Sequence, residues 1–135
     1  MAQPRTLDFE TMRLRGRHNQ FLVAPPGLCR NARPHAESPA FEVPVAALRR
    51  AVLAMLREQP RLELVQQDDW QITVIQRSRL FRFPDIIDIR LIDLGEGRST
   101  LAIYSRSKYG RTDFGVNGGR VGSWLRAVRN RLEPA

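Results

Sequence analysis

Apolar and polar residues alternate with a period of two in four consecutive segments of the chain. This alternation predicts strands at 61–67, 70–78, 85–94 and 99–106. Only a few residues separate each segment from the next, and a parallel return would need a long crossover. We therefore expect the four strands to pair antiparallel in one sheet, with Trp70 on the apolar face of the second strand.

Apolar residues at helical spacing predict two helices. The first begins at Pro44, after a short strand candidate at Phe41-Glu42-Val43, and ends before Pro60. The second follows Asn117, and an apolar helix face of this kind must cover another apolar surface. Its apolar stripe consists of Val121, Trp124, Leu125, Val128 and Leu132. The expected contacts of that stripe on the sheet are Ile72, Ile87, Ile89, Leu101 and Ile103.

Together these elements predict an α+β fold with the order β-α-β-β-β-β-α. It is a single antiparallel sheet of about five strands with two helices on one face. Residues 1–38 have no lasting period, so we expect an irregular N-terminal arm followed by a single α+β domain at 39–135. The order is similar to helix-grip and TATA-binding-protein-like layouts. A helix lying across a curved sheet can leave an apolar cavity, although so few short strands favour a filled core.

The chain has 135 residues and a formal net charge of +8, and Lys108 is the only lysine among its 22 basic residues. The arginines are spread along the whole sequence, and aromatic residues make up only 7%. A nucleic-acid site usually concentrates basic residues on one face and adds stacking aromatics. We therefore predict no specific nucleic-acid partner, whereas a small anionic ligand or an acidic protein partner fits the charge.

The single cysteine, Cys29, excludes an internal disulfide and suits a reducing compartment. It has no cluster of Cys or His near it in the sequence, so we predict no metal site, and no motif indicates a cofactor. The sequence has neither the apolar core of a signal peptide nor a run of about 20 apolar residues. The prediction is a soluble cytoplasmic protein without a transmembrane segment, for which peripheral membrane association stays open.

The polar and glycine-rich segment 104–117, YSRSKYGRTDFGVN, lies between the last strand and the second helix. Strand alternation places Ser105 and Ser107 on the core side of the sheet and Arg106 on the opposite side. The candidate binding residues are this set and its neighbours: Ser105, Arg106, Ser107, Lys108, Arg111, Asp113, Asn117 and Asp85.

Two roles are open for these residues. Asn117 is expected to be the N-cap of the second helix, and Gly118-Gly119 would leave first-turn amides uncovered beside cations such as Arg120. Such amides would accept an anion. In the competing structural role, which we favour for the segment itself, Asp113 pairs with an arginine and the serines bond the backbone at the strand's end.

Motifs of known catalytic sites are absent from the sequence, which has no nucleophile elbow, Walker loop or dinucleotide fingerprint. The only histidines, His18 and His35, belong to no nucleophile motif. The favoured function is a non-enzymatic binding or interaction module with an anion-accepting strand-to-helix loop. The alternatives are a small carrier with an apolar cavity under the C-terminal helix, or an enzyme that uses Asp85 and Asp113 as a carboxylate pair.

Two stretches resemble a known family: Phe83-Pro84-Asp85, and a run with Ser105, Arg106, Ser107, Lys108, Gly110, Asp113, Gly115, Val116 and Asn117. The family is the one called domain of unknown function 1499, and the resemblance extends from Asn19 to the end. Asn19-Gln20-Phe21-Leu22 and Pro25-Pro26-Gly27-Leu28-Cys29 look like its alphaproteobacterial branch. Many members carry a membrane segment or export signal, which we do not expect here. The resemblance implies a fold and no activity, cofactor or ligand.

Overall fold

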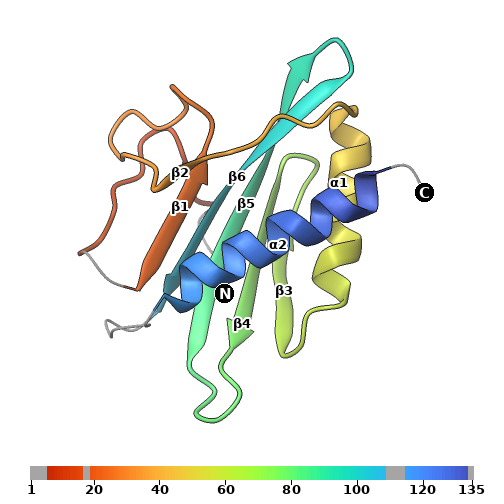
Figure 1. Cartoon of the computed structure of the whole chain (residues 1–135). Helices are drawn as coiled ribbons and strands as arrows, with labels where there is room; N and C mark the ends of the chain where they lie inside the picture. Colours follow the sequence, from red (N-terminus) through yellow and green to blue (C-terminus); the bar gives the residue numbers. More distant parts are fainter. Residues whose placement is uncertain (1–5, 17–18, 109–114, 134–135) are drawn as a thin grey trace.

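The computed structural model describes residues 6–16, 19–108 and 115–133, and it has an α+β fold (Figure 1). Its elements in chain order are β1 (Gln20–Ala24), β2 (Ala36–Glu37), α1 (Val45–Arg57), β3 (Leu62–Gln67), β4 (Gln71–Arg77), β5 (Pro84–Gly95), β6 (Arg98–Ser107) and α2 (Val116–Leu132). The two helices and the four strands β3 to β6 lie close to their predicted positions.

One six-stranded sheet has the order β2-β1-β6-β5-β4-β3. The four strands β3 to β6 pair antiparallel with their chain neighbours, as predicted. The prediction of a purely antiparallel sheet of about five strands is wrong, because β2 pairs parallel to β1 and makes the sheet mixed. The long strands β5 and β6 form the centre, where Ile89 lies opposite Ile103.

The strand β1 lies in the segment that the sequence predicted to be irregular. It pairs antiparallel with β6, so that Val23 lies opposite Ile103. Leu22, Val23 and Ala24 are all buried, because both faces of the sheet are covered at this strand. A strand buried on both faces has no alternation of apolar and polar residues. For this reason the sequence pattern did not predict β1. Phe41, expected in a short strand, makes only an isolated bridge to Ser99.

Both helices pack on the same face of the sheet, as predicted (Figure 1). Trp124 and Val128 of α2 are buried in one cluster with Ile87 and Ile103 of the sheet, whereas Leu125 is only partly buried. Residues of α1 belong to the same cluster. This core therefore fills the space between the helices and the sheet.

The opposite face of the sheet is covered by the N-terminal segment. Phe9 and Met12 are buried there against Leu22 of β1 and Tyr104 of β6. Because side chains alternate along a strand, Leu22 and Tyr104 point away from the helices. The molecule therefore has three layers: the two helices, the sheet, and the N-terminal segment.

Trp70 differs from its prediction. The strand β4 begins one residue later, and the Trp70 side chain is 51% exposed. Asp68 Oδ1 accepts hydrogen bonds from the backbone N–H groups of Trp70 and Gln71, at 2.8 and 2.7 Å. The aspartate thus forms a turn that takes Trp70 out of the strand.

Candidate functional site

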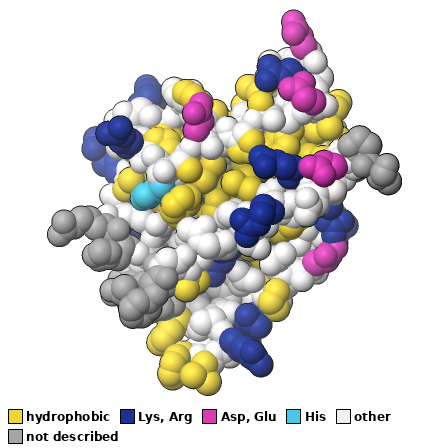
Figure 2. Space-filling model, in the orientation of Figure 1, with side chains coloured by type: hydrophobic (Ala, Val, Ile, Leu, Met, Phe, Trp, Pro, Cys, Tyr) yellow, Lys and Arg dark blue, Asp and Glu magenta, His cyan; other side chains and the backbone are white. Residues whose placement is uncertain are grey.

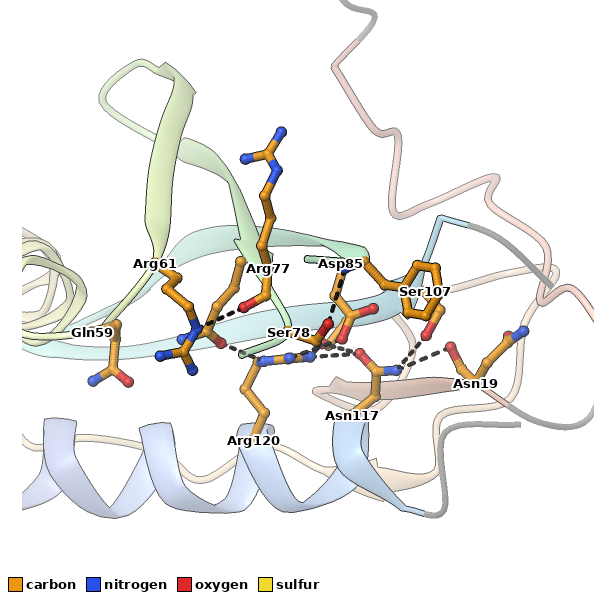
Figure 3. Close-up of polar contacts among 12 residues, drawn as sticks. Asn19, Gln59, Arg61, Arg77, Ser78, Asp85, Ser107, Asn117 and Arg120 are labelled. Carbon is orange, nitrogen blue, oxygen red and sulfur yellow. Dashed lines mark hydrogen bonds and ion pairs between the residues drawn. The ribbon is translucent and has the colours of Figure 1, made fainter. Parts of the chain in front are cut away.

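Polar side chains meet between the start of α2 and the sheet, where β5 begins and β6 ends (Figure 3). Strand pairing sets Asp85 of β5 between Gln76 of β4 and Ser107 of β6. Asn117 and Arg120 of α2 reach the same place, because residues three positions apart lie on the same helix face. We use the name corner network for five residues whose side chains are buried or nearly so: Gln76, Asp85, Ser105, Asn117 and Arg120.

Arg120 is the centre of the corner network. Its Nη2 donates to Asp85 Oδ2 at 2.8 Å, and its Nε–H donates to Gln76 Oε1 at 2.7 Å. Its Nη1 donates to Ser105 Oγ at 3.0 Å and to Asn117 Oδ1 at 2.8 Å. The rigid guanidinium fork can hold several acceptors at once. Since Asp85 balances its charge, the ion pair at the centre of the network is neutral overall.

Asn117 connects α2 with the sheet. Its Oδ1 accepts from the Ser105 hydroxyl at 2.5 Å, and its Nδ2 donates to the Asn19 carbonyl at 3.1 Å and to Ser107 Oγ at 3.4 Å. The prediction that Asn117 is the N-cap is wrong. Gly115 is the N-cap, with a φ of 82° that glycine adopts at low cost. The helix starts earlier than predicted, and Asn117 points into the protein from its first turn.

Arg106 lies on the other face of the sheet, as strand alternation predicted. Its Nη1 donates to Asp88 Oδ2 at 2.6 Å, and its guanidinium carbon lies 4.7 Å from the centre of the Tyr104 ring. Asp88 also accepts from the Thr73 hydroxyl at 2.5 Å. Arg106 is therefore held in a second ion pair, away from Ser105 and the corner network.

Of the remaining candidate residues, the structure describes only Lys108. Lys108 is exposed, and its backbone N–H donates to the Pro84 carbonyl at 3.0 Å. Arg111 and Asp113 lie outside the described residues. The structure thus brings together four of the eight predicted residues: Asp85, Ser105, Ser107 and Asn117.

Sequence reasoning missed the central roles of Gln76 and Arg120. Arg120 was expected only as one cation near the helix start, although it lies four residues before Trp124 and thus on the same helix face, which was a usable signal. Gln76 reaches the site because it lies opposite Asp85 in the pairing of β4 with β5. That register could not be read from the alternation alone, since the pattern gives the buried face of each strand and not its partner.

The chemistry of the described residues at this site is that of paired and hydrogen-bonded groups. Asp85 is buried and engaged by a guanidinium, an arrangement typical of structural ion pairs. Within the described ranges, no group of three or more His, Cys, Asp or Glu side chains could hold a metal ion. Elsewhere, burial raises the pKa of the Cys29 thiol above its ordinary value of 9.0.

Two of the surface grooves beside the helices bear on a carrier function. One, of about 240 Å³, is between α1 and the strands β3 and β4, lined by residues that include Leu53, Leu62 and Val74. The other, of about 410 Å³, is between residues 40–43 and the last turn of α2. The space between α2 and the sheet is instead filled, chiefly by Trp124.

Fold and site define a class of protein: a small α+β domain whose central sheet is covered by helices on one face and whose strand-to-helix corner is fixed by buried polar side chains. The chain belongs to the family described as "Protein of unknown function (DUF1499)", whose model matches residues 18–128. This span contains the whole corner network but not Phe9 and Met12. The chain matches none of the curated proteins with which it was compared. None of the helices that the structure describes is long and apolar enough to cross a membrane.

Proposed function

We propose that this protein is a non-enzymatic binding or interaction module whose strand-to-helix connection accepts a small anion or an acidic segment of a protein partner. The observation that carries the proposal is the rigid frame on both sides of that connection. On the strand side, the backbone N–H of Lys108 bonds Pro84. On the helix side, Asn117 and Arg120 are held by the corner network. Loops on rigid frames of this kind commonly carry binding residues.

Charge supports the same proposal. Arg120 pairs with Asp85 and Arg106 pairs with Asp88, so each of these buried acids is already engaged by an arginine. Lys108 is exposed, and the sequence adds the basic Arg111 and the acidic Asp113 to the same strand-to-helix connection. On the evidence of the lone cysteine, we place the protein in the cytoplasm, where anionic metabolites and acidic proteins are available.

The alternative functions receive less support. An enzyme using Asp85 would need that carboxylate at a reacting group, whereas the side chain is buried and bound to Arg120 at 2.8 Å. A carrier with a cavity under α2 would need space that Trp124 occupies. The groove beside α1, about 240 Å³, is smaller than the about 300–1,000 Å³ typical of ligand pockets, whereas the groove of about 410 Å³ falls within that range and lies at the last turn of α2.

The experiment is a titration with sulfate and phosphate, followed by amide NMR of the full chain at constant ionic strength. We expect shift changes confined to residues 105–120 at millimolar anion, weakened by added salt because exposed charges are screened. Lys108→Gln and Arg111→Gln should each reduce the response. The matched control is Arg50→Gln, which removes an exposed arginine of α1. Absence of shifts in this segment, or equal losses with Arg50→Gln, would contradict the proposal.

A further inference from the structure

The turn between β4 and β5 forms a defined projection, which we call the hairpin tip (residues 78–83). It is closed at its base by two hydrogen bonds: the Ser78 backbone N–H donates to the Phe83 carbonyl at 2.9 Å, and the Phe83 N–H donates to Ser78 Oγ at 2.9 Å. The tip extends beyond one end of the sheet, at the bottom of Figure 1. One backbone–backbone bond and one bond to the Ser78 hydroxyl thus hold the base of the tip.

Large apolar side chains gather on the hairpin tip. Leu80 is 78% exposed, Phe81 is 68% exposed and Phe83 is 37% exposed, and the two phenylalanine rings lie 5.7 Å apart. In Figure 2 they form a hydrophobic group at one extremity of the molecule. Single exposed apolar residues are ordinary, but three neighbours at a projecting tip indicate a contact with another apolar phase.

Arginines flank this apolar group. Arg79 precedes Leu80, and Arg82 follows Phe81; both arginines are exposed, and no acidic residue occurs between 78 and 84. An arginine beside inserted apolar side chains can keep its charge at the interface while its stem lies along apolar surface. Apolar residues bordered by cations are typical of segments that lie in the surface of an anionic bilayer.

The size and shape of the tip favour a bilayer over a protein partner. A stable protein interface covers about 800 Å² on each partner and 20–30 residues, far more than a six-residue convex tip presents. A bilayer surface is deformable, and binding needs apolar groups to enter only about 5–10 Å. We propose that the hairpin tip docks this protein on anionic lipid membranes, with Leu80 and Phe81 in the headgroup boundary and Arg79 and Arg82 against lipid phosphates.

This inference does not rest on the proposed anion site, because the hairpin tip (78–83) and the strand-to-helix connection share no residue. The magnitude of binding follows from two contributions. Each arginine near an anionic membrane is worth about fivefold in affinity, so two together give about thirtyfold. Each apolar side chain that leaves water adds about tenfold or more.

The test is co-sedimentation of the full chain with vesicles of phosphatidylcholine alone, or with about one third phosphatidylserine. We expect binding to the anionic vesicles, weakened by salt. Leu80→Ser/Phe81→Ser should reduce affinity by about a hundredfold, and Arg79→Gln/Arg82→Gln by about thirtyfold. The matched control is Leu94→Ser at the far end of β5, where the side chain is 45% exposed, and it should bind like the unchanged protein.

Several results would overturn the proposal. They are no binding to anionic vesicles, equal binding to both vesicle types, or an equal loss with Leu94→Ser. Analytical ultracentrifugation tests the competing occupant. A concentration-dependent dimer that Leu80→Ser/Phe81→Ser abolishes, in a protein that does not bind vesicles, would show instead that the tip joins two copies of the chain. Because the four substituted tip positions, 79–82, are exposed, circular dichroism should show every tip variant folded.

Discussion

At the scale of single residues, Arg120 shows how this fold tolerates charge in its interior. Removing a charge from water costs several kcal/mol, and a buried ion pair offsets that cost only with close geometry and further hydrogen bonds. Arg120 meets both conditions, since Asp85 is 2.8 Å away and Gln76, Ser105 and Asn117 accept three further hydrogen bonds from its guanidinium. The pair is therefore sensitive to loss of one member, even though its net stabilising contribution is small.

We predict that Arg120→Met lowers the free energy of unfolding by about 3–5 kcal/mol, because it leaves Asp85 charged and buried. The surface pair Arg77–Glu63 is the control: the two side chains are 35% and 58% exposed, so Arg77→Met should cost at most about 1 kcal/mol. Urea titration measures both values. Adding Asp85→Asn to Arg120→Met should recover part of the loss. Equal effects of Arg120→Met and Arg77→Met would show that the corner network contributes no more than a surface pair.

The Cys29 thiol gives a pH prediction. Burial raises its pKa above 9.0, and only the thiolate reacts with alkylating agents. Alkylation of the folded protein should therefore rise with pH along a curve displaced to higher pH than that of the protein in denaturant. The folded state holds the proton more tightly, so the free energy of unfolding should fall as the pH rises above 9.0. Coincident alkylation curves in the folded and denatured protein would contradict the prediction.

At the scale of elements, the contact between α2 and β1 depends on a missing side chain. A Cβ atom added at Gly118 would lie 3.2 Å from Phe21 Cδ1, closer than ordinary carbon contacts. Phe21 cannot move freely, because its ring stacks on His35 with ring centres 5.0 Å apart. An added Cβ at Gly119 would meet no atom within 4 Å. Gly119 therefore has room for a side chain, whereas Gly118 has room only if Phe21 moves.

We predict that Gly119→Ala raises the free energy of unfolding by up to about 1 kcal/mol, since alanine favours helix more than glycine does. Gly118→Ala should gain less or become destabilising, and Gly118→Val should cost about 1–3 kcal/mol through overpacking against Phe21. Thermal and urea unfolding compare the three. The companion change Phe21→Leu should relieve part of the Gly118→Val loss. The prediction is wrong if Gly118→Ala stabilises as much as Gly119→Ala.

Elements with one buried face could be predicted from the sequence, and elements set by their surroundings could not. The strands β3 to β6 and both helices carry their own periodicity. The strand β1 does not, because its surroundings bury Leu22 and Val23 on opposite faces. At the candidate site, alternation separated Ser105 from Arg106 correctly. It could not supply the register that brings Gln76 to Asp85.

At the scale of the whole molecule, the N-terminal segment closes the fold. The strand β1 pairs with β6, which would otherwise be an edge strand with unpaired backbone groups. The segment before β1 buries Phe9 and Met12 on the face away from the helices. Its residues thus supply both an internal strand of the sheet and the third layer.

We predict that a chain beginning at Pro39 does not unfold cooperatively, because it loses β1, β2 and the whole cover of the second face. In the full chain, Phe9→Ala should cost about 3–5 kcal/mol, as expected for truncating a fully buried aromatic residue. A separate peptide of residues 1–38 should restore cooperative unfolding when it binds the shortened chain and supplies the missing strand and layer. Urea titration measures the cooperativity and free energy of unfolding, and the spread of amide chemical shifts in NMR shows whether the shortened chain is folded. The sequence-based prediction of a domain at 39–135 is tested by the same experiment: a shortened chain that unfolds cooperatively, at the urea midpoint of the full protein, would establish that domain and reduce the N-terminal layer to an accessory.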